Sequence, residues 1–237
     1  MRRQCTELAA GQWQEHVTMT AEPRKSPVTE AVRSLEVRWI FPGQLETAVA
    51  RWFGRFPAET QSRQDTYLLD PQLRGLSVKV RGGGALEVKV YRGSAGNLEV
   101  PGRARGRIQS WQKWSFPVSP LRQDSGDPAG WQPVRKRRRI SWFSLAGEPI
   151  AARAPGLDGE PRCAVELTEV CTHGQDWWTL GFEATGPADL LRSELHATAA
   201  LVFAQALPGG VEPGMDDSGS YAEWLSRRPG SGSNDGV

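Results

Sequence analysis

The sequence predicts an α+β fold: an antiparallel β-barrel of eight strands, closed or nearly closed around a tunnel, with helices packed outside. Apolar and polar residues alternate with a period of two in eight segments, which is typical of half-buried strands. The polar face of these segments carries charges of both signs in segment after segment. If the sheet curls into a barrel with the helices outside, that charged face points into the lumen.

The first predicted strand covers residues 34–41, after a stretch without periodicity. Leu35, Val37 and Trp39 share one face and are expected in the core. The other face of this strand carries Ser34, Glu36 and Arg38. Residues 44–56 follow with apolar side chains at helical spacing, which predicts an amphipathic helix packed on the sheet.

A hairpin is predicted at residues 75–93, where two short strands flank a turn of three glycines. The apolar face of the hairpin is made of valines and a leucine. Its charged face holds Lys79, Arg81, Glu87 and Lys89. The three glycines do not form a phosphate loop, because no Gly-Lys-Ser/Thr follows them and they join two strands.

The other elements follow from the same two patterns. Further strands are expected at residues 63–69, 108–118, 134–145, 163–170 and 177–184, and a second helix at residues 187–207. Residues 97–107 are expected to form a basic loop. In the run VRKRRRISWFSL we expect Arg135, Arg137 and Arg139 on the inward face. In the last hairpin the inward acids are Glu166 and Glu183.

We expect three parts: a flexible extension at residues 1–33, a barrel domain at residues 34–207, and a tail at residues 208–237 that docks partly through its SYAEWL segment. The 29 basic and 27 acidic residues nearly balance, so no specific nucleic-acid binding is expected. Three cysteines do not make a disulfide scaffold, and no apolar run is long enough for a membrane span. These features favour a cytoplasmic protein without a membrane partner.

The inward faces together hold more bases than acids. Unpaired charges in a lumen are costly unless water or a ligand compensates them, so an anionic guest is expected. Arg and Lys suit a polyanion such as a small phosphorylated compound, while clustered glutamates suit a divalent cation, Mg²⁺ or Mn²⁺. The expected metal ligands are Glu36, Glu87, Glu166 and Glu183. The expected phosphate-binding residues are Arg38, Lys79, Arg81, Lys89, Arg135, Arg137 and Arg139.

At these residues the chain resembles the CYTH family, the triphosphate tunnel metalloenzymes, over about residues 34–207. The resemblance lies in Ser34-x-Glu36-x-Arg38, Arg63-x-Asp65-x-Tyr67, Lys79-x-Arg81, Glu87-x-Lys89 and the later strands that carry Arg135 to Arg139, Glu166 and Glu183. It implies a divalent-metal-dependent phosphohydrolase that acts on a triphosphate, a nucleotide or a polyphosphate. Glu36 and Glu183 would then be the catalytic carboxylates.

One departure from the family pattern bears directly on catalysis. The family opens with Glu-x-Glu-x-Lys, whereas this chain has Ser34 in place of the first acid and Arg38 in place of the lysine. Arg still holds phosphate, but serine is a poor ligand for a hard cation. A second hypothesis is therefore a sensor or carrier of polyphosphate or nucleotide with weak or no catalysis. A third, in which the charges merely pair with one another, conflicts with the excess of inward bases.

Overall fold

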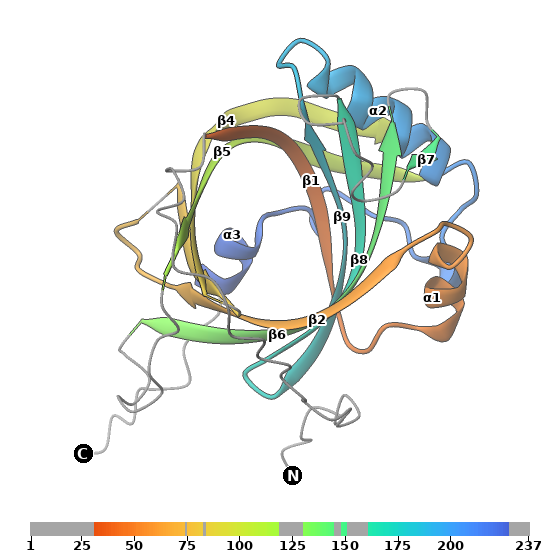
Figure 1. The fold of residues 1–237 in the computed structure, drawn as a ribbon. Coiled ribbons are helices and arrows are strands. Elements are labelled where there is room, and N and C mark those ends of the chain that lie inside the picture. The colour runs from red at the N-terminus through yellow and green to blue at the C-terminus, as the bar shows by residue number, and fades with distance from the viewer. Residues whose placement is uncertain are drawn as a thin grey trace, which may run out of the picture.

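The barrel is closed. The computed structural model describes residues 31–73, 75–82, 84–118, 130–144, 148–150 and 161–227. Its strands are β1 (Val32–Pro42), β2 (Glu59–Leu68), β3 (Leu76–Arg81), β4 (Ala85–Val100), β5 (Ala104–Pro117), β6 (Trp131–Ser144), β7 (Pro149–Ile150), β8 (Arg162–Thr172) and β9 (Gln175–Thr185). They form one antiparallel sheet in the order β2-β3-β4-β5-β1-β9-β8-β6-β7, and β2 also pairs with β6. Eight strands thus close on themselves and β7 extends from β6, which confirms the predicted antiparallel barrel (Figure 1).

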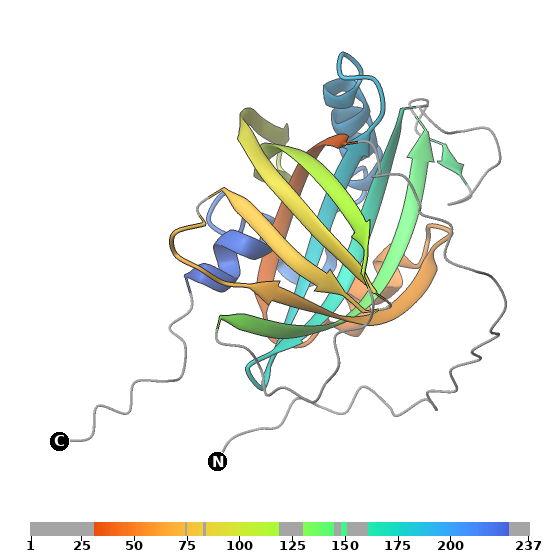
Figure 2. The same cartoon turned by 60° about the vertical axis from the view of Figure 1, so that its left-hand side comes forward.

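Two helices pack outside this barrel, as predicted, and a third lies at its end. α1 (Thr47–Phe53) and α2 (Leu191–Val202) cover the outer face of the sheet, while the strands run obliquely around the wall (Figure 2). α3 (Tyr221–Ser226) is seen through the ring of strands in the view along the barrel (Figure 1). Within the described residues, no helix has the length and apolar character needed to cross a membrane.

The main hydrophobic core lies between the barrel wall and α1 and α2, not inside the barrel. Trp39 of β1 is fully buried, and its ring meets Phe182 of β9 and Phe203 after α2 edge to face, with centroids 6.1 and 5.8 Å apart. On β1, β8 and β9 the apolar face packs in this core, so the charged face remains for the interior. Val78, Leu86 and Val88 of β3 and β4 lie outside this core and stay half-buried. This division is what the alternation predicts.

Several elements begin or end at other residues than expected, and most of the strands are longer. The first helix is shorter than the predicted 44–56, and the second shorter than 187–207, because the flanking residues adopt turns while still contributing apolar contacts. The prediction of a loop at residues 97–107 was wrong, since β4 and β5 extend into these residues and only a short turn joins them. Register shifts near Gly93 and Gly96, both at positive φ, bulge β4 and break the alternation there.

Close packing of β5 against β1 gives the first test. A Cβ built on Gly106 would lie 2.7 Å from both Trp39 Cζ2 and Val37 Cγ2, both part of buried core side chains. We expect Gly106→Ala to lower the free energy of unfolding by about 1–3 kcal/mol through overpacking. Urea unfolding measures this, with Arg105→Ala as control because that exposed side chain should contribute less than about 0.5 kcal/mol. Equal stability of both variants and the wild type would contradict the packing argument.

Candidate functional site

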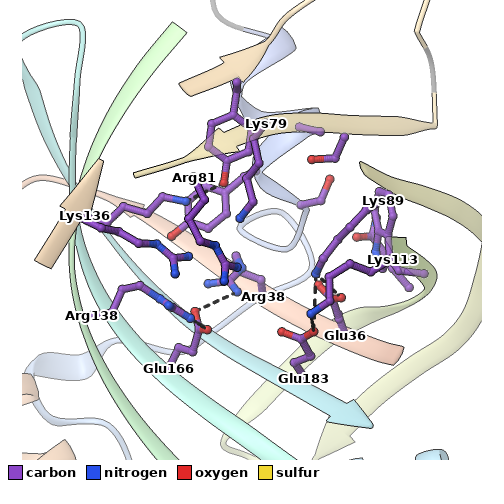
Figure 3. Close-up of a pocket in the computed structure, with 18 residues that line it drawn as sticks. Glu36, Arg38, Lys79, Arg81, Lys89, Lys113, Lys136, Arg138, Glu166 and Glu183 are labelled. Carbon is purple, nitrogen blue, oxygen red and sulfur yellow. Dashed lines mark hydrogen bonds and ion pairs between the residues drawn. The ribbon is translucent and has the colours of Figure 1, made fainter. Parts of the chain in front are cut away.

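A basic chamber lies inside the barrel, and its wall is made by the inward face of the strands together with α3 (Figure 3). Eight cations and three glutamates line it, along with aromatic and small polar residues. The cations are Arg38, Arg63, Lys79, Arg81, Lys89, Lys113, Lys136 and Arg138. The acids are Glu36, Glu166 and Glu183. The chamber has a volume of about 80 Å³, room for several water molecules or a phosphate-sized group.

Asp65 of β2 organises the cations on one side of the chamber. The carboxylate is fully buried, and its Oδ2 accepts from Lys79 Nζ at 3.3 Å and Lys136 Nζ at 3.2 Å. Arg63 Nε lies 3.1 Å from Oδ1. Burial alone would raise the pKa of Asp65, but Lys79, Lys136 and Arg63 outweigh it and hold the pKa well below 3.8. Asp65 therefore stays ionised and binds three cations from three strands.

Lys136 is the most enclosed of these cations. Its Nζ donates to Tyr67 Oη at 2.6 Å and lies 3.7 Å from the centre of the Tyr221 ring. Burial lowers the pKa of Lys136 well below its usual value, and Asp65 opposes that shift only in part. The pKa of Lys79 is likewise lowered by burial. An anion entering the chamber would raise the pKa of both amines, because it favours their charged form.

Two glutamates are each held by two cations. Glu87 is buried, with Lys79 Nζ 2.8 Å and an Arg81 guanidinium nitrogen 2.7 Å from its oxygens, and the two cations overcome burial to lower the pKa of Glu87 to about 2. Glu166 accepts from Arg38 at 3.4 Å and also from Arg138. These arginines overcome burial and hold the pKa of Glu166 well below its usual value. Both carboxylates thus orient bases around the chamber.

Glycine at position 181 makes room for Arg38. A Cβ on Gly181 would stand 2.7 Å from the guanidinium carbon of Arg38, so any other residue would displace that side chain. The guanidinium also donates to Thr179 Oγ1 at 3.1 Å and lies 4.7 Å from the Tyr221 ring centre. These contacts consequently fix the position of the Arg38 side chain in the chamber wall.

The remaining acids, Glu36 and Glu183, lie directly opposite each other on β1 and β9. Glu36 Oε1 accepts from Ser34 Oγ at 2.7 Å and from Lys89 Nζ at 2.6 Å. Glu183 Oε1 lies 3.7 Å from Lys89 Nζ and 3.5 Å from Lys113 Nζ. Burial would raise the pKa of Glu183, but these two lysines hold it well below its usual value. Glu183 therefore stays ionised, and the two carboxylates share Lys89.

α3 closes the deep end of the chamber. Ser220, Tyr221 and Ala222 form part of the wall, and Tyr221 Oη lies 3.0 Å from Thr179 Oγ1. The helix is fixed by a capping box between Ser220 and Glu223, and by Gln109 Nε2, which donates to Glu223 at 3.0 Å. The segment predicted to dock through its aromatic residues therefore contacts the site itself.

The structure brings together four of the predicted phosphate-binding residues, Arg38, Lys79, Arg81 and Lys89, and all line the chamber. The prediction of which β6 residues face inward was wrong. Arg135, Arg137 and Arg139 share the outer face of β6 with buried Phe143, and Arg137 and Arg139 pair with Glu169 at 3.7 and 3.5 Å. Lys136 and Arg138 point inward in their place. Residues 135–139 are all cationic, so the alternation of apolar and polar residues could not show which of them face inward.

Four further residues of the site were not predicted as site residues: Arg63, Asp65, Lys113 and Tyr221. Asp65 and Arg63 stand in a segment whose motif was noted, but their contacts depend on pairing with distant strands. Lys113 shares the phase of Trp111, which also lines the chamber, so alternation along β5 is the signal that could have found it.

The four glutamates expected to bind a metal are not gathered into one cluster. Glu87 and Glu166 are held by separate cation pairs, and only Glu36 and Glu183 face each other. In the part of the chain that the structure describes, no three or more His, Cys, Asp or Glu side chains are grouped so that they could hold a metal ion. Magnesium, however, is commonly bound by one or two carboxylates together with substrate phosphates. Glu36 and Glu183 fit that kind of site.

No protein-family model matches the chain, and no curated protein matches it either. Among solved structures, the S. pombe Pct1 RNA triphosphatase is 12% identical, with 75% of this chain and 82% of that chain covered and a TM-score of 0.38. A conserved hypothetical protein from Pyrococcus furiosus is 15% identical, with 79% and 98% covered and a TM-score of 0.40. PH1819 from Pyrococcus horikoshii is 14% identical, with 81% and 97% covered and a TM-score of 0.41. At these TM-scores the likeness decides neither family nor function.

The buried Asp65 cluster gives a test of the site's electrostatics. We expect Asp65→Asn to lower the free energy of unfolding at pH 7 by about 3–5 kcal/mol, because three buried cations lose their shared counter-charge. The pKa of Asp65 is depressed in the folded protein, so its contribution is present above about pH 4 and is lost as the pH falls toward the folded-state pKa. The difference between variant and wild type should therefore shrink between pH 7 and pH 3.

Urea unfolding at the two pH values measures this difference. The control is Glu59→Gln, since Glu59 is exposed at the start of the same strand and should change stability by less than about 0.5 kcal/mol at either pH. A constant difference for Asp65→Asn at both pH values would show that the carboxylate acts through packing and not through its charge.

Proposed function

We propose that the chamber binds a triphosphate- or polyphosphate-type anion. The observation that supports this most is the surplus of positive charge: eight cations line the chamber, against three glutamates. Counting buried Asp65 and Glu87 as well gives eight cations against five acids. Like charges enclosed in a low-dielectric space repel one another, so a polyanion placed among them is stabilised.

The types of cation favour phosphate over other anions. Four arginines line the chamber: Arg38, Arg63, Arg81 and Arg138. A guanidinium fork matches two phosphate oxygens at once, whereas the lysines act as point charges. The cations come from several strands around the barrel, so one anion would be surrounded and not merely touched on one side. A chain of phosphates carries several charges and uses such a surrounding site more fully than a single carboxylate.

Hydrolysis of the bound anion is a second candidate, favoured by the adjacent pair Glu36 and Glu183. These two carboxylates would hold Mg²⁺ or Mn²⁺ jointly with phosphate oxygens of the substrate. When bound, such an ion polarises a phosphoryl oxygen and favours attack by water. Arg38 and Lys89 would stabilise negative charge as it develops, and Glu183 would orient a water molecule.

The sensor hypothesis draws on the same region. Ser34 offers no carboxylate, and Glu36 is already occupied by Ser34 Oγ and Lys89 Nζ on one oxygen. If Lys89 remains on Glu36 when the anion is bound, a cation has only Glu183 and a partly neutralised Glu36 as protein ligands. The chamber would then bind phosphate compounds with little turnover. Measuring binding and phosphate release separately distinguishes these two functions.

The two faces of β6 provide a matched test of anion binding. We expect Arg138→Gln to weaken tripolyphosphate binding by about 10- to 100-fold, because it removes a charged donor inside the chamber. Arg137→Gln, on the outer face of the same strand, should change the affinity by less than about twofold. Calorimetric titration in EDTA measures both. A larger loss from Arg137→Gln than from Arg138→Gln would contradict an anion site in the chamber.

Metal-dependent hydrolysis is tested by phosphate release from tripolyphosphate and nucleoside triphosphates with Mg²⁺, Mn²⁺ or EDTA. If the protein is an enzyme, Glu36→Gln and Glu183→Gln should each reduce release to the level seen with EDTA, since each removes a charged oxygen ligand. Their affinity for tripolyphosphate in EDTA should not fall, because a negative charge is lost from a site for anions. Ser34→Glu should increase metal-stimulated release.

The control for this experiment is Glu169→Gln on the outer face of the barrel, which should leave release unchanged. Tight binding without metal-stimulated release in the wild type would favour the sensor. Unaltered release in both tunnel variants would exclude Glu36 and Glu183 from the chemistry.

A further inference from the structure

A second, wider chamber adjoins the basic chamber. Six residues belong to both walls: Arg63, Arg81, Lys113, Arg138, Glu166 and Glu183. The outer chamber has a volume of about 730 Å³, against about 80 Å³ for the inner one. The two chambers are therefore neighbours along the barrel, and the outer one has room for a group much larger than a phosphate.

The wall changes its chemistry from the inner to the outer chamber along single strands. On the inward face of β6, Lys136 lines the inner chamber and Arg138 lines both, whereas Ile140 and Trp142 line only the outer one. On β1 the inner positions are Arg38 and Glu36, and the outer position is Val32, which is 38% exposed. Apolar side chains thus enter the outer wall, where they stand beside Arg33, Arg162 and the four cations that both chambers share.

Trp142 is the large aromatic residue of this outer wall. Its partner across the β6–β8 pair is Ala164, which also lines the chamber and is too small to fill the space beside the indole ring. The guanidinium of Arg162, also in the wall, lies 5.1 Å from the centre of the Trp142 ring. An indole and a neighbouring guanidinium are both groups on which a planar ring can stack.

The charges on the two sides of the inner chamber favour entry of an anion from the outer chamber. At the opposite end α3 separates the inner chamber from a groove on its far side, and Trp111, Ser220 and Ala222 line both spaces. Among the described residues that line this groove there is no Lys or Arg, and Asp70 and Glu223 are present. A phosphate chain would thus be drawn inward from the outer chamber and stop against α3, with its other end left beside Trp142.

We propose that the outer chamber is a binding site for a planar ring, so that the ligand is an organic triphosphate with its phosphates inside and its aromatic group stacked at Trp142. This proposal rests on the proposed anion binding and adds the organic half of the ligand. A nucleoside triphosphate has the required form. Inorganic tripolyphosphate would contact the cations alone and leave Trp142 unused.

The test compares ATP with inorganic tripolyphosphate by calorimetric titration in EDTA, so that binding is measured without metal-dependent turnover. We expect Trp142→Ala to weaken ATP binding by about 5- to 100-fold, the effect of losing one stacked base, and to change tripolyphosphate binding by less than twofold. Trp142→Phe should retain most of the ATP affinity because it keeps a ring. Trp131→Ala, on the same strand but outside both chambers, is the matched control.

The outcomes separate the two proposals. If the wild type binds neither ATP nor tripolyphosphate, the proposed function is wrong and this inference falls with it. If tripolyphosphate binds and Trp142→Ala affects both ligands equally, or neither, the anion site stands and the ring site is overturned. Circular dichroism and thermal unfolding of each variant show whether it is folded. If Trp142→Ala is unfolded, Trp142→Gln and Arg162→Ala replace it, and unchanged ATP affinity in both contradicts the ring site.

Discussion

The barrel closes where β2 pairs with β6, and Asp65 lies in the middle of that pairing. Its carboxylate joins Arg63 of the same strand, Lys79 of β3 and Lys136 of β6. Without this shared counter-charge, three buried cations would repel one another across the closing pair. A charged face can therefore turn inward only because buried acids neutralise part of it. The closure of the fold and the basic interior depend on the same ion pairs.

The acids neutralise the cations incompletely, and their distribution matters as much as their number. Asp65, Glu87 and Glu166 each hold two or more bases in place, while Glu36 and Glu183 share Lys89. Bases fixed in this way lose little conformational freedom when an anion arrives, and their positive field is in place beforehand. The ion pairs thus prepare the interior for a ligand, and the remaining surplus of cations supplies the attraction.

Alternation predicted the inward faces of β1, β8 and β9, whose opposite faces pack in the core. It also predicted those of β3 and β4, where charged residues alternate with valines and a leucine that stay half-buried outside the core. It failed on β6, where residues 135–139 are all cationic and either phase looks the same. Pairing with β8 decides the question, since Arg139 lies opposite core residue Leu167. Asp65 was missed for a related reason. Its ion pairs form only because β2 lies between β3 and β6, and this strand order cannot be predicted from the local sequence.

Packing outside the barrel determines which residues of β6 face inward. Phe143 is fully buried and packs against Phe56, with ring centroids 5.3 Å apart, near α1. A slip of one residue would expel Phe143 from the core and exchange the two faces of the strand. Lys136 and Arg138 would leave the inner chamber, and Ile140 and Trp142 would leave the outer one, all at once. Packing of one aromatic residue in the core therefore fixes both the cations that face a phosphate and the apolar wall at the entrance.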